Sequence, residues 1–253
     1  MALKRVITTP LYYVNDKPHL GSAYTTLAGD TIARFYRLQG DNVIFITGVD
    51  EHGQKIQRTA ESKGIKPQEH CDEIVNTYYT LWEKWDITND RFIRTSDNDH
   101  HKLVIEFFKK VEASGDIKLD RQKGWYCVGC EEYKEVNDDS KTPKCNIHLR
   151  ELEWRDEENL FFKLSKYQSV IEELIANNIA LLPENRRNEI VNFVKGGLKD
   201  FSISRVNLDW GIPVPGYEGH TFYVWFDALV GYLTALINNT SIEEPLDQLT
   251  EYG

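Results

Sequence analysis

The stretch from Lys4 to Gly53, KRVITTPLYYVNDKPHLGSAYTTLAGDTIARFYRLQGDNVIFITGVDEHG, carries the pattern that decides the fold class. Its first segment, Lys4–Thr9, alternates and then becomes β-branched, as a strand does. From Ser22 onward apolar side chains recur every three or four residues until Gly40, which predicts a helix with a glycine stop. The continuous apolar run Asn42–Gly48 is short enough for a buried parallel strand. Strand, helix and strand in this order predict a βαβ unit and therefore an α/β protein with a parallel sheet.

Further helices are predicted along the rest of the chain, with one interruption. The pattern between Ile117 and about Leu164 breaks into short strands and turns, and we interpret this part as an insert. Helical periodicity or a helix start and stop signal marks these ranges: 53–63, 67–85, 98–114, a segment from Lys166, 184–198 and 224–236.

Length and composition indicate a globular protein with one large domain, with or without an insert. The 253 residues are 41% hydrophobic and 28% charged, with a formal net charge of −10, so no chain-wide basic field exists to hold nucleic acid. The most apolar run, from Phe222, is shorter than a bilayer span and contains Asp227. No signal-peptide pattern precedes Pro10. We therefore expect a cytoplasmic protein without membrane contact.

Three of the four cysteines lie close together in the insert. The spacing Cys127-x2-Cys130 followed by Cys145-x2-His148 can bring three thiolates and one imidazole to a tetrahedral Zn²⁺ ion. Because four protein ligands close the coordination sphere, such a site would be structural. The alternative is three incidental buried thiols and a surface histidine.

Two loops leave the carboxyl ends of the first two predicted strands, where ligands bind in open parallel sheets. In the first, Gly21 permits close backbone approach, and the start of the next helix offers free N–H groups and partial positive charge for a phosphate. His19 can donate to phosphate oxygens, and Pro18 stiffens the turn. A tight turn with Ser22 as a helix cap is the alternative interpretation.

The second loop, Gly48–Gly53, contains Asp50, a natural partner for an ammonium group. Its alternative role is a helix N-cap. Taken together, the two loops predict one crevice that holds an amine and a triphosphate side by side.

Several ordered motifs resemble those of the methionyl-tRNA synthetases, which are class I aminoacyl-tRNA synthetases with a Rossmann-type catalytic domain. The matching motifs are PLYYVNDKPHLGS, TGVDEHGQKIQ, the Cys-x2-Cys and Cys-x2-His pair, FSISR, DWGIPVPG and YVWFDALVGY. The resemblance implies that methionine attacks the α-phosphate of ATP, accompanied by Mg²⁺, to give methionyl-adenylate and pyrophosphate. The methionyl group then passes to tRNA, and no protein nucleophile is needed.

The resemblance also implies the roles of the loop residues. The family's ATP signature corresponds here to His19, Leu20, Gly21 and Ser22, with Pro18 just before it. His19 and Ser22 are the implied catalytic residues. The fourth signature position is normally histidine, and Ser22 cannot carry the positive charge of that residue. The pattern resembles a cyanobacterial or plastid branch of the family.

A methionine pocket is implied by the same comparison, because aromatic walls suit a thioether and a carboxylate suits the α-amine. Its implied residues are Leu11, Tyr13, Asp50, Trp225, Ala228, Leu229 and Tyr232. The alternative interpretation of Trp225, Ala228, Leu229 and Tyr232 is that they belong to an ordinary core helix.

The implied domains are a first catalytic half over 1–116, a zinc-binding connective-peptide insert over 117–205, and the start of the second catalytic half over 206–253. The insert of the family packs near the acceptor end of tRNA, and this one leaves no room for an editing domain. Five basic residues are candidates for contact with RNA or ATP phosphate: Arg186, Arg187, Lys195, Lys199 and Arg205. A solvated helix face explains these positive charges equally well.

The second ATP signature of the family, Lys-Met-Ser-Lys-Ser, does not occur in these residues, and neither does an anticodon-binding helical domain. The chain therefore resembles an amino-terminal part of such an enzyme, and we expect little adenylation activity from it alone. Two alternatives stay open: another class I synthetase, or a non-catalytic RNA-binding or assembly module derived from one.

Overall fold

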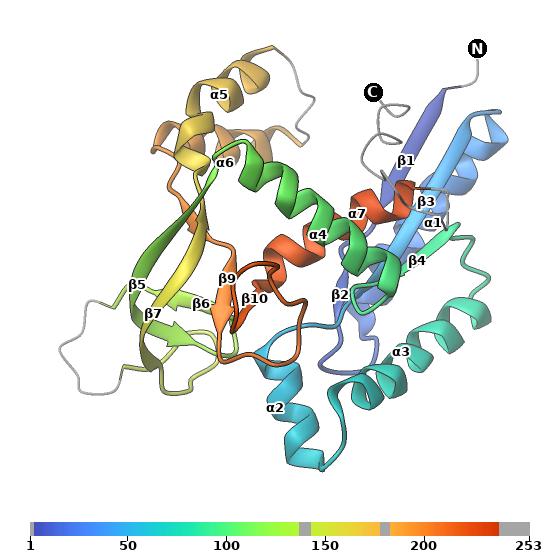
Figure 1. Cartoon of the computed structure of the whole chain (residues 1–253). Coiled ribbons are helices and arrows are strands. Elements are labelled where there is room, and N and C mark those ends of the chain that lie inside the picture. Colours follow the sequence, from blue (N-terminus) through green and yellow to red (C-terminus); the bar gives the residue numbers. More distant parts are fainter. Residues whose placement is uncertain (1–2, 137–142, 178–182, 238–253) are drawn as a thin grey trace.

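The computed structural model describes residues 3–136, 143–177 and 183–237 (Figure 1). Its first sheet is parallel and has β3 (Asn42–Asp50) in the middle. β1 (Lys4–Thr8) and β2 (Tyr12–Tyr13) pair in succession with one side of β3, and β4 (Arg91–Arg94) pairs with the other side. The strands after which the two predicted loops leave are therefore direct neighbours, as the sequence pattern predicts.

Helices cover both faces of this sheet. α1 (Leu20–Leu38) and α3 (Pro67–Lys84) lie on one face and α7 (Val224–Leu236) lies on the other. α4 (Asn98–Ala113) packs on α7, and α2 (Gln54–Lys63) packs against α3. Alternate side chains of β3 point to opposite faces. Phe45 packs with Ala33 of α1 on one face, whereas Ile46 packs with Ala235 of α7 on the other. Asp50 follows Ile46 at an even interval, so it belongs to the face that α7 covers.

A second, antiparallel sheet is formed by the insert. Its strands, in spatial order, are β6 (Glu132–Lys134), β5 (Ile117–Cys127), β7 (Glu153–Phe162) and β8 (Phe201–Ser202). The short helix η1 (Leu164–Tyr167), α5 (Gln168–Ala176) and α6 (Glu184–Lys195) follow β7. β9 (Ser204–Val206) and β10 (His220–Phe222) pair as a separate antiparallel ribbon that leads into α7.

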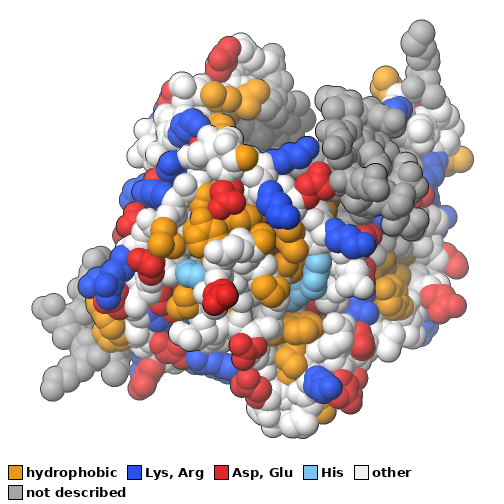
Figure 2. Space-filling view, in the orientation of Figure 1, with side chains coloured by type: hydrophobic (Ala, Val, Ile, Leu, Met, Phe, Trp, Pro, Cys, Tyr) orange, Lys and Arg blue, Asp and Glu red, His pale blue; other side chains and the backbone are white. Residues whose placement is uncertain are grey.

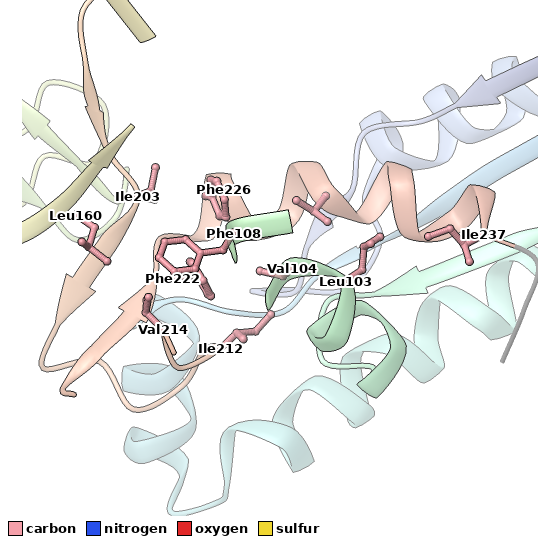
Figure 3. Close-up of a cluster of buried hydrophobic side chains, with 11 residues drawn as sticks. Leu103, Val104, Phe108, Leu160, Ile203, Ile212, Val214, Phe222, Phe226 and Ile237 are labelled. Atoms are coloured by element: carbon pink, nitrogen blue, oxygen red, sulfur yellow. The ribbon is translucent and has the colours of Figure 1, made fainter. Parts of the chain in front are cut away.

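The insert shares a hydrophobic core with α4, β10 and α7. Phe108 of α4 meets Phe222 edge-on, with ring centroids 5.1 Å apart, and Phe222 stacks on Phe226 of α7. Leu160 and Ile203 of the insert join the same cluster (Figure 3). α7 therefore packs at once against the parallel sheet and against the insert.

The predicted fold class is confirmed, with corrections in detail. The sequence pattern missed β2 and β4, and β3 continues two residues beyond Gly48, so that Asp50 ends the strand instead of lying in a loop. The strands of the insert are not all short, because β5 has 11 residues and β7 has 10. The segment from Lys166 begins as η1 and becomes α-helical only at Gln168. Among the described residues, no helix is both long and apolar enough to cross a membrane.

Candidate nucleotide and amino-acid site

His19 is the N-cap of α1, and its imidazole caps the helix. Its Nδ1 accepts hydrogen bonds from the backbone N–H groups of Gly21, at 3.0 Å, and Ser22, at 3.4 Å. Because Nδ1 is an acceptor, the neutral ring carries its proton on Nε2. The side chain is exposed, so this Nε2–H is available to an incoming acceptor.

The first turn of α1 differs from the expected phosphate cradle. The imidazole of His19 already occupies two amide groups that were expected to be free. A Cβ at position 21 would lie 2.8 Å from the ring of His19, so Gly21 makes room for the imidazole itself. Ser22 completes a capping box by accepting from the His19 N–H at 3.0 Å. Its side chain is buried, and a direct phosphate contact by its hydroxyl would require this cap to open.

Asp50 has an unpaired oxygen. Its Oδ1 is buried and has no hydrogen-bond partner. Burial raises the pKa of Asp50 well above its usual value, and the negative charges of Asp227 and Glu131 raise it further. The predicted alternative role as an N-cap is excluded, because the N-cap of the following helix, α2, is Gly53. A buried acceptor without a partner suits a ligand that brings its own positive charge.

Other predicted residues of the amino-acid pocket surround Asp50. Tyr13 lies directly beside it in the β2–β3 register. Tyr232 of α7 is near enough for the charge of Asp50 to raise the pKa of its phenol, after burial as the main cause, and its hydroxyl donates to the Thr9 carbonyl at 3.2 Å. Leu11 packs against Gly231, where a Cβ would come within 2.9 Å of its methyl group.

The remaining predicted pocket residues lie elsewhere on α7. Trp225 and Leu229 share a helix face with Tyr232 by spacing, but they are 58% and 63% exposed. Ala228 is half-buried between them. Trp225 and Leu229 line a groove of about 1290 Å³ that runs between the exposed side of α4 and α7 and the insert, with Phe161 and Phe193 on the side of the insert. Figure 2 shows apolar side chains gathered in the middle of the face of the molecule that is turned to the viewer.

The two predicted loops leave the same carboxyl edge of the sheet, because β1 and β3 are parallel neighbours. α1 covers the face opposite to the one to which Asp50 belongs, so the first turn of α1 and Asp50 can share a ligand only at the carboxyl edge. β2 connects them there. The hydroxyl of Tyr12 donates to the Ser22 carbonyl at 3.0 Å, and the next residue, Tyr13, pairs with Asp50.

Sequence reasoning missed a buried cluster of ionisable groups around Asp227. One carboxylate oxygen lies 2.5 Å from His52 Nδ1 and the other 2.6 Å from His100 Nε2, and all three side chains are buried. Burial opposes ionisation, but the charge of His52 and the hydrogen bonds from both rings lower the pKa of Asp227 to about 2. The signal was present, since Asp227 is the one acidic residue within the apolar run from Phe222.

Three other charged residues make contacts within the protein. Glu51, the second carboxylate of the DEH sequence, is fully buried and accepts from Arg94 at 2.7 Å. Arg205 is only 5% exposed and lies over the ring of Tyr223, so the alternative of a solvated helix face does not apply to it, and its contact with RNA or ATP phosphate stays a prediction. Arg186 forms an ion pair with Glu189 on the surface of α6.

The four predicted metal ligands of the insert come together. The ligand atoms of Cys127, Cys130, Cys145 and His148 all lie within 4.8 Å of one another. His148 Nδ1 is 3.3 Å from the sulfur of Cys130 and 3.9 Å from the other two sulfurs. Although burial opposes it, hydrogen bonds from His148 lower the pKa of the Cys145 thiol to about 6. This donor set could hold a zinc ion.

Position 129, between the first two cysteines, has to be glycine. A Cβ there would lie 2.7 Å from the ring of His148. Backbone N–H groups also point at two of the sulfurs, from Cys130 to Cys127 at 3.4 Å and from His148 to Cys145 at 3.5 Å. Such bonds stabilise thiolates, which are the form that binds metal.

A parallel sheet with a capped turn at its carboxyl edge, beside an insert with a Cys/His cluster, defines an α/β protein with a candidate metal-binding module. The sequence profile of the family "tRNA synthetases class I (M)" matches residues 5–137 and 133–252. The chain therefore belongs to this family of class I tRNA synthetases.

Individual relatives agree with this assignment. The chain is 58% identical to a methionine–tRNA ligase of Synechocystis sp. over 94% of its own length and 45% of that protein. It is 50% identical to the chloroplastic/mitochondrial methionine–tRNA ligase of Arabidopsis thaliana, over 98% of this chain and 40% of the relative. The Mycobacterium tuberculosis methionyl-tRNA synthetase in complex with methionyl-adenylate superimposes with a TM-score of 0.87 at 37% identity, covering 98% of this chain and 49% of that one. The chain thus spans about half the length of these relatives.

Proposed function

We propose that this chain forms the methionine-binding and ATP-binding part of a methionine–tRNA ligase. The observation that carries the proposal is the buried, unpartnered Oδ1 of Asp50 at the carboxyl end of β3. The solved relative in complex with methionyl-adenylate supports the substrate class.

In this proposal the α-ammonium of methionine pairs with Asp50 and removes the cost of its unpaired charge. Tyr13 and Tyr232 flank the amino acid, and Leu11 offers apolar contact to the thioether. Ala228, Trp225 and Leu229 form the outer wall, and the last two are exposed, so they are free to close on the methionine side chain.

ATP is proposed to bind at the turn before α1. His19 donates from Nε2 to a phosphate oxygen, and Pro18 and Gly21 give the turn the shape that the imidazole needs. Ser22 acts by holding this turn through its capping box. Catalysis then consists of positioning the methionine carboxylate in line with the α-phosphate and stabilising the charge that develops on the phosphate oxygens. Mg²⁺ accompanying ATP is a prediction of the same proposal.

Zn²⁺ at Cys127, Cys130, Cys145 and His148 is proposed to be structural, because the four ligands leave no open position. We expect about one zinc per chain in freshly purified, unchelated protein, and elemental analysis that finds none would contradict the site. Contact of the insert with tRNA, a cytoplasmic location, and domain boundaries at 116/117 and 205/206 stay predictions.

The test of the proposed function is calorimetric titration of the chain with methionine. We expect binding to the native chain, and a loss of at least about ten-fold in Asp50→Ala, because removing a charged partner of a buried ammonium costs more than about 1.4 kcal/mol. Asp209→Asn, which changes an exposed carboxylate, is the matched control. Equal affinity in the native chain and Asp50→Ala would contradict the assignment.

The same titrations separate the alternatives. Preference for leucine or cysteine over methionine would indicate a different class I synthetase. Binding of tRNA without affinity for methionine or ATP would indicate a non-catalytic module. The expectation of little adenylation by these residues alone is checked by ATP–pyrophosphate exchange, and robust exchange would prove it wrong.

A further inference from the structure

Glu131 reaches out of the insert into the candidate methionine site. It directly follows the metal ligand Cys130, and it is only 6% exposed. Its Oε1 accepts from the hydroxyl of Tyr13 at 3.0 Å and from the backbone N–H of Lys55 at 3.2 Å. One carboxylate therefore contacts a wall residue of the pocket and the first turn of α2.

The start of α2 is built to receive this carboxylate. The N-cap of α2, Gly53, provides no side-chain cap, so Glu131 accepts from the first turn in its place. A negative charge at a helix N-terminus is also favourable. A side chain at position 53 would collide with the carboxylate oxygens of Glu131, and the φ angle of +117° there suits glycine as well.

The backbone of Glu131 holds the opposite wall of the pocket. Its carbonyl accepts from the hydroxyl of Tyr223 at 2.7 Å, and Tyr223 is the N-cap of α7. α7 carries Trp225, Ala228 and Tyr232. Glu131 thus joins Tyr13 on one side of the proposed pocket to the start of α7 on the other.

Glu131 also has a φ angle of +55°, which a residue with a side chain adopts at a cost. Glycine would adopt this angle more easily. A strained backbone angle that persists at a residue with specific contacts indicates that the side chain is needed there.

We propose that Glu131 is a positioning residue that couples the metal-binding cluster to the methionine pocket. When the metal holds Cys130, the next residue is held where its carboxylate fixes Tyr13 and the start of α2, and its carbonyl fixes the start of α7. Loss of the metal releases Glu131 and loosens the pocket, although none of the proposed pocket residues is one of the four candidate metal ligands. This inference rests on the proposed function.

The experiment compares methionine affinity, by calorimetry, in the native chain, Glu131→Gln and Glu131→Gly. Glycine relieves the strained backbone angle but removes the carboxylate, so we expect affinity at least about ten-fold weaker. Glutamine keeps one acceptor oxygen, so we expect an intermediate loss of about three-fold. Glu135→Gln, an exposed carboxylate of the same segment, is the control and should bind as the native chain does. Native affinity in Glu131→Gly would overturn the proposal.

Zinc removal supplies the decisive comparison. Chelation of zinc should weaken methionine binding by the native chain about as much as the Glu131→Gly substitution does. In the Glu131→Gly variant, chelation should weaken binding little further, because both changes act through the same contact. Equal losses on chelation in the two proteins would overturn the coupling.

A second readout needs no methionine. Exchange of the Lys55 amide hydrogen should become about ten-fold faster in Glu131→Gly and in the chelated native chain, since its acceptor is lost. The Leu160 and Ile203 amides, which bond within the insert, report that the insert stays folded. Failure of the native chain to bind methionine would count against the proposed function alone, whereas an unchanged Lys55 rate would count against the coupling alone.

Discussion

At the scale of single residues, Asp50 combines two properties that oppose each other. Its charge is unfavourable in the free protein because the group is buried near Asp227 and Glu131. The same charge is what an ammonium ligand needs. Binding sites commonly keep groups that destabilise the free protein.

We therefore expect Asp50→Asn to make the protein more stable at pH 7, by about 1–2 kcal/mol, while it weakens methionine binding. A carboxyl group whose pKa is raised in the folded state favours folding at low pH, and this contribution is lost as the pH rises through the folded pKa. The stability advantage of Asp50→Asn should therefore shrink as the pH is lowered. Urea unfolding at several pH values measures it, and a variant less stable than the native chain at pH 7 would contradict the argument.

The pKa of Asp227 is shifted in the opposite direction to that of Asp50. Its pKa is lowered to about 2, so its ionised form contributes stability above the unfolded pKa of about 3.9, and this is lost as the pH falls toward 2. We expect Asp227→Asn to reduce the free energy of unfolding by about 3 kcal/mol near neutral pH, because two buried imidazoles lose their carboxylate. The difference should narrow below about pH 4. A pH-independent difference would contradict the role of the ionised group.

At the scale of elements, the pairing of β3 with β4 depends on one glycine. A Cβ at Gly48 would collide with the backbone carbonyl of Ile93, and a backbone atom cannot turn aside as a side chain can. We expect Gly48→Ala to lower the free energy of unfolding by about 2–4 kcal/mol, measured by chemical denaturation. Gly196→Ala, at the end of α6 in an ordinary helical conformation, serves as the control. Equal stability of the two variants would show that the strands separate without cost.

At the scale of the whole molecule, α1 has an apolar face that nothing covers within the described part of the chain. Its exposed side chains are Leu20 at 84%, Tyr24 at 72%, Leu27 at 46%, Phe35 at 54% and Leu38 at 87%. Within the described residues, β1 also pairs with β3 alone, so its other edge is open. Contiguous apolar surface and an open strand edge both favour association.

We therefore expect this chain by itself to self-associate with rising concentration. The double substitution Tyr24→Lys with Leu38→Lys should shift it toward the monomer, as measured by light scattering. Val170→Lys with Leu174→Lys, on the half-exposed face of α5, is the matched control and should change little. A native chain that stays monomeric throughout the titration would contradict this prediction.

The sequence alone determined the elements whose signals are local. Strand and helix periodicity placed β1, α1, β3 and α7, and the spacing of Cys127, Cys130, Cys145 and His148 predicted a cluster that the structure assembles. The motifs that follow β1 and β3, together with those of the insert and of the segment up to α7, predicted the family, because they combine residue type with order along the chain. The short strands β2 and β4 were missed, since two to four residues carry no measurable periodicity.

Only the tertiary structure decided which groups share a site. The imidazole of His19 accepts from backbone amides that were expected to be free for phosphate. Asp227 lies between two histidines that are distant in sequence. Glu131 of the insert accepts a hydrogen bond from Tyr13 of the first sheet. These contacts join residues separated by up to 175 positions, and no local pattern encodes them. The physical reason is that burial gives such groups their effect. A carboxylate in water needs no partner, whereas one enclosed by packed elements must find one, and the packing of α7 and the insert decides which partner it finds.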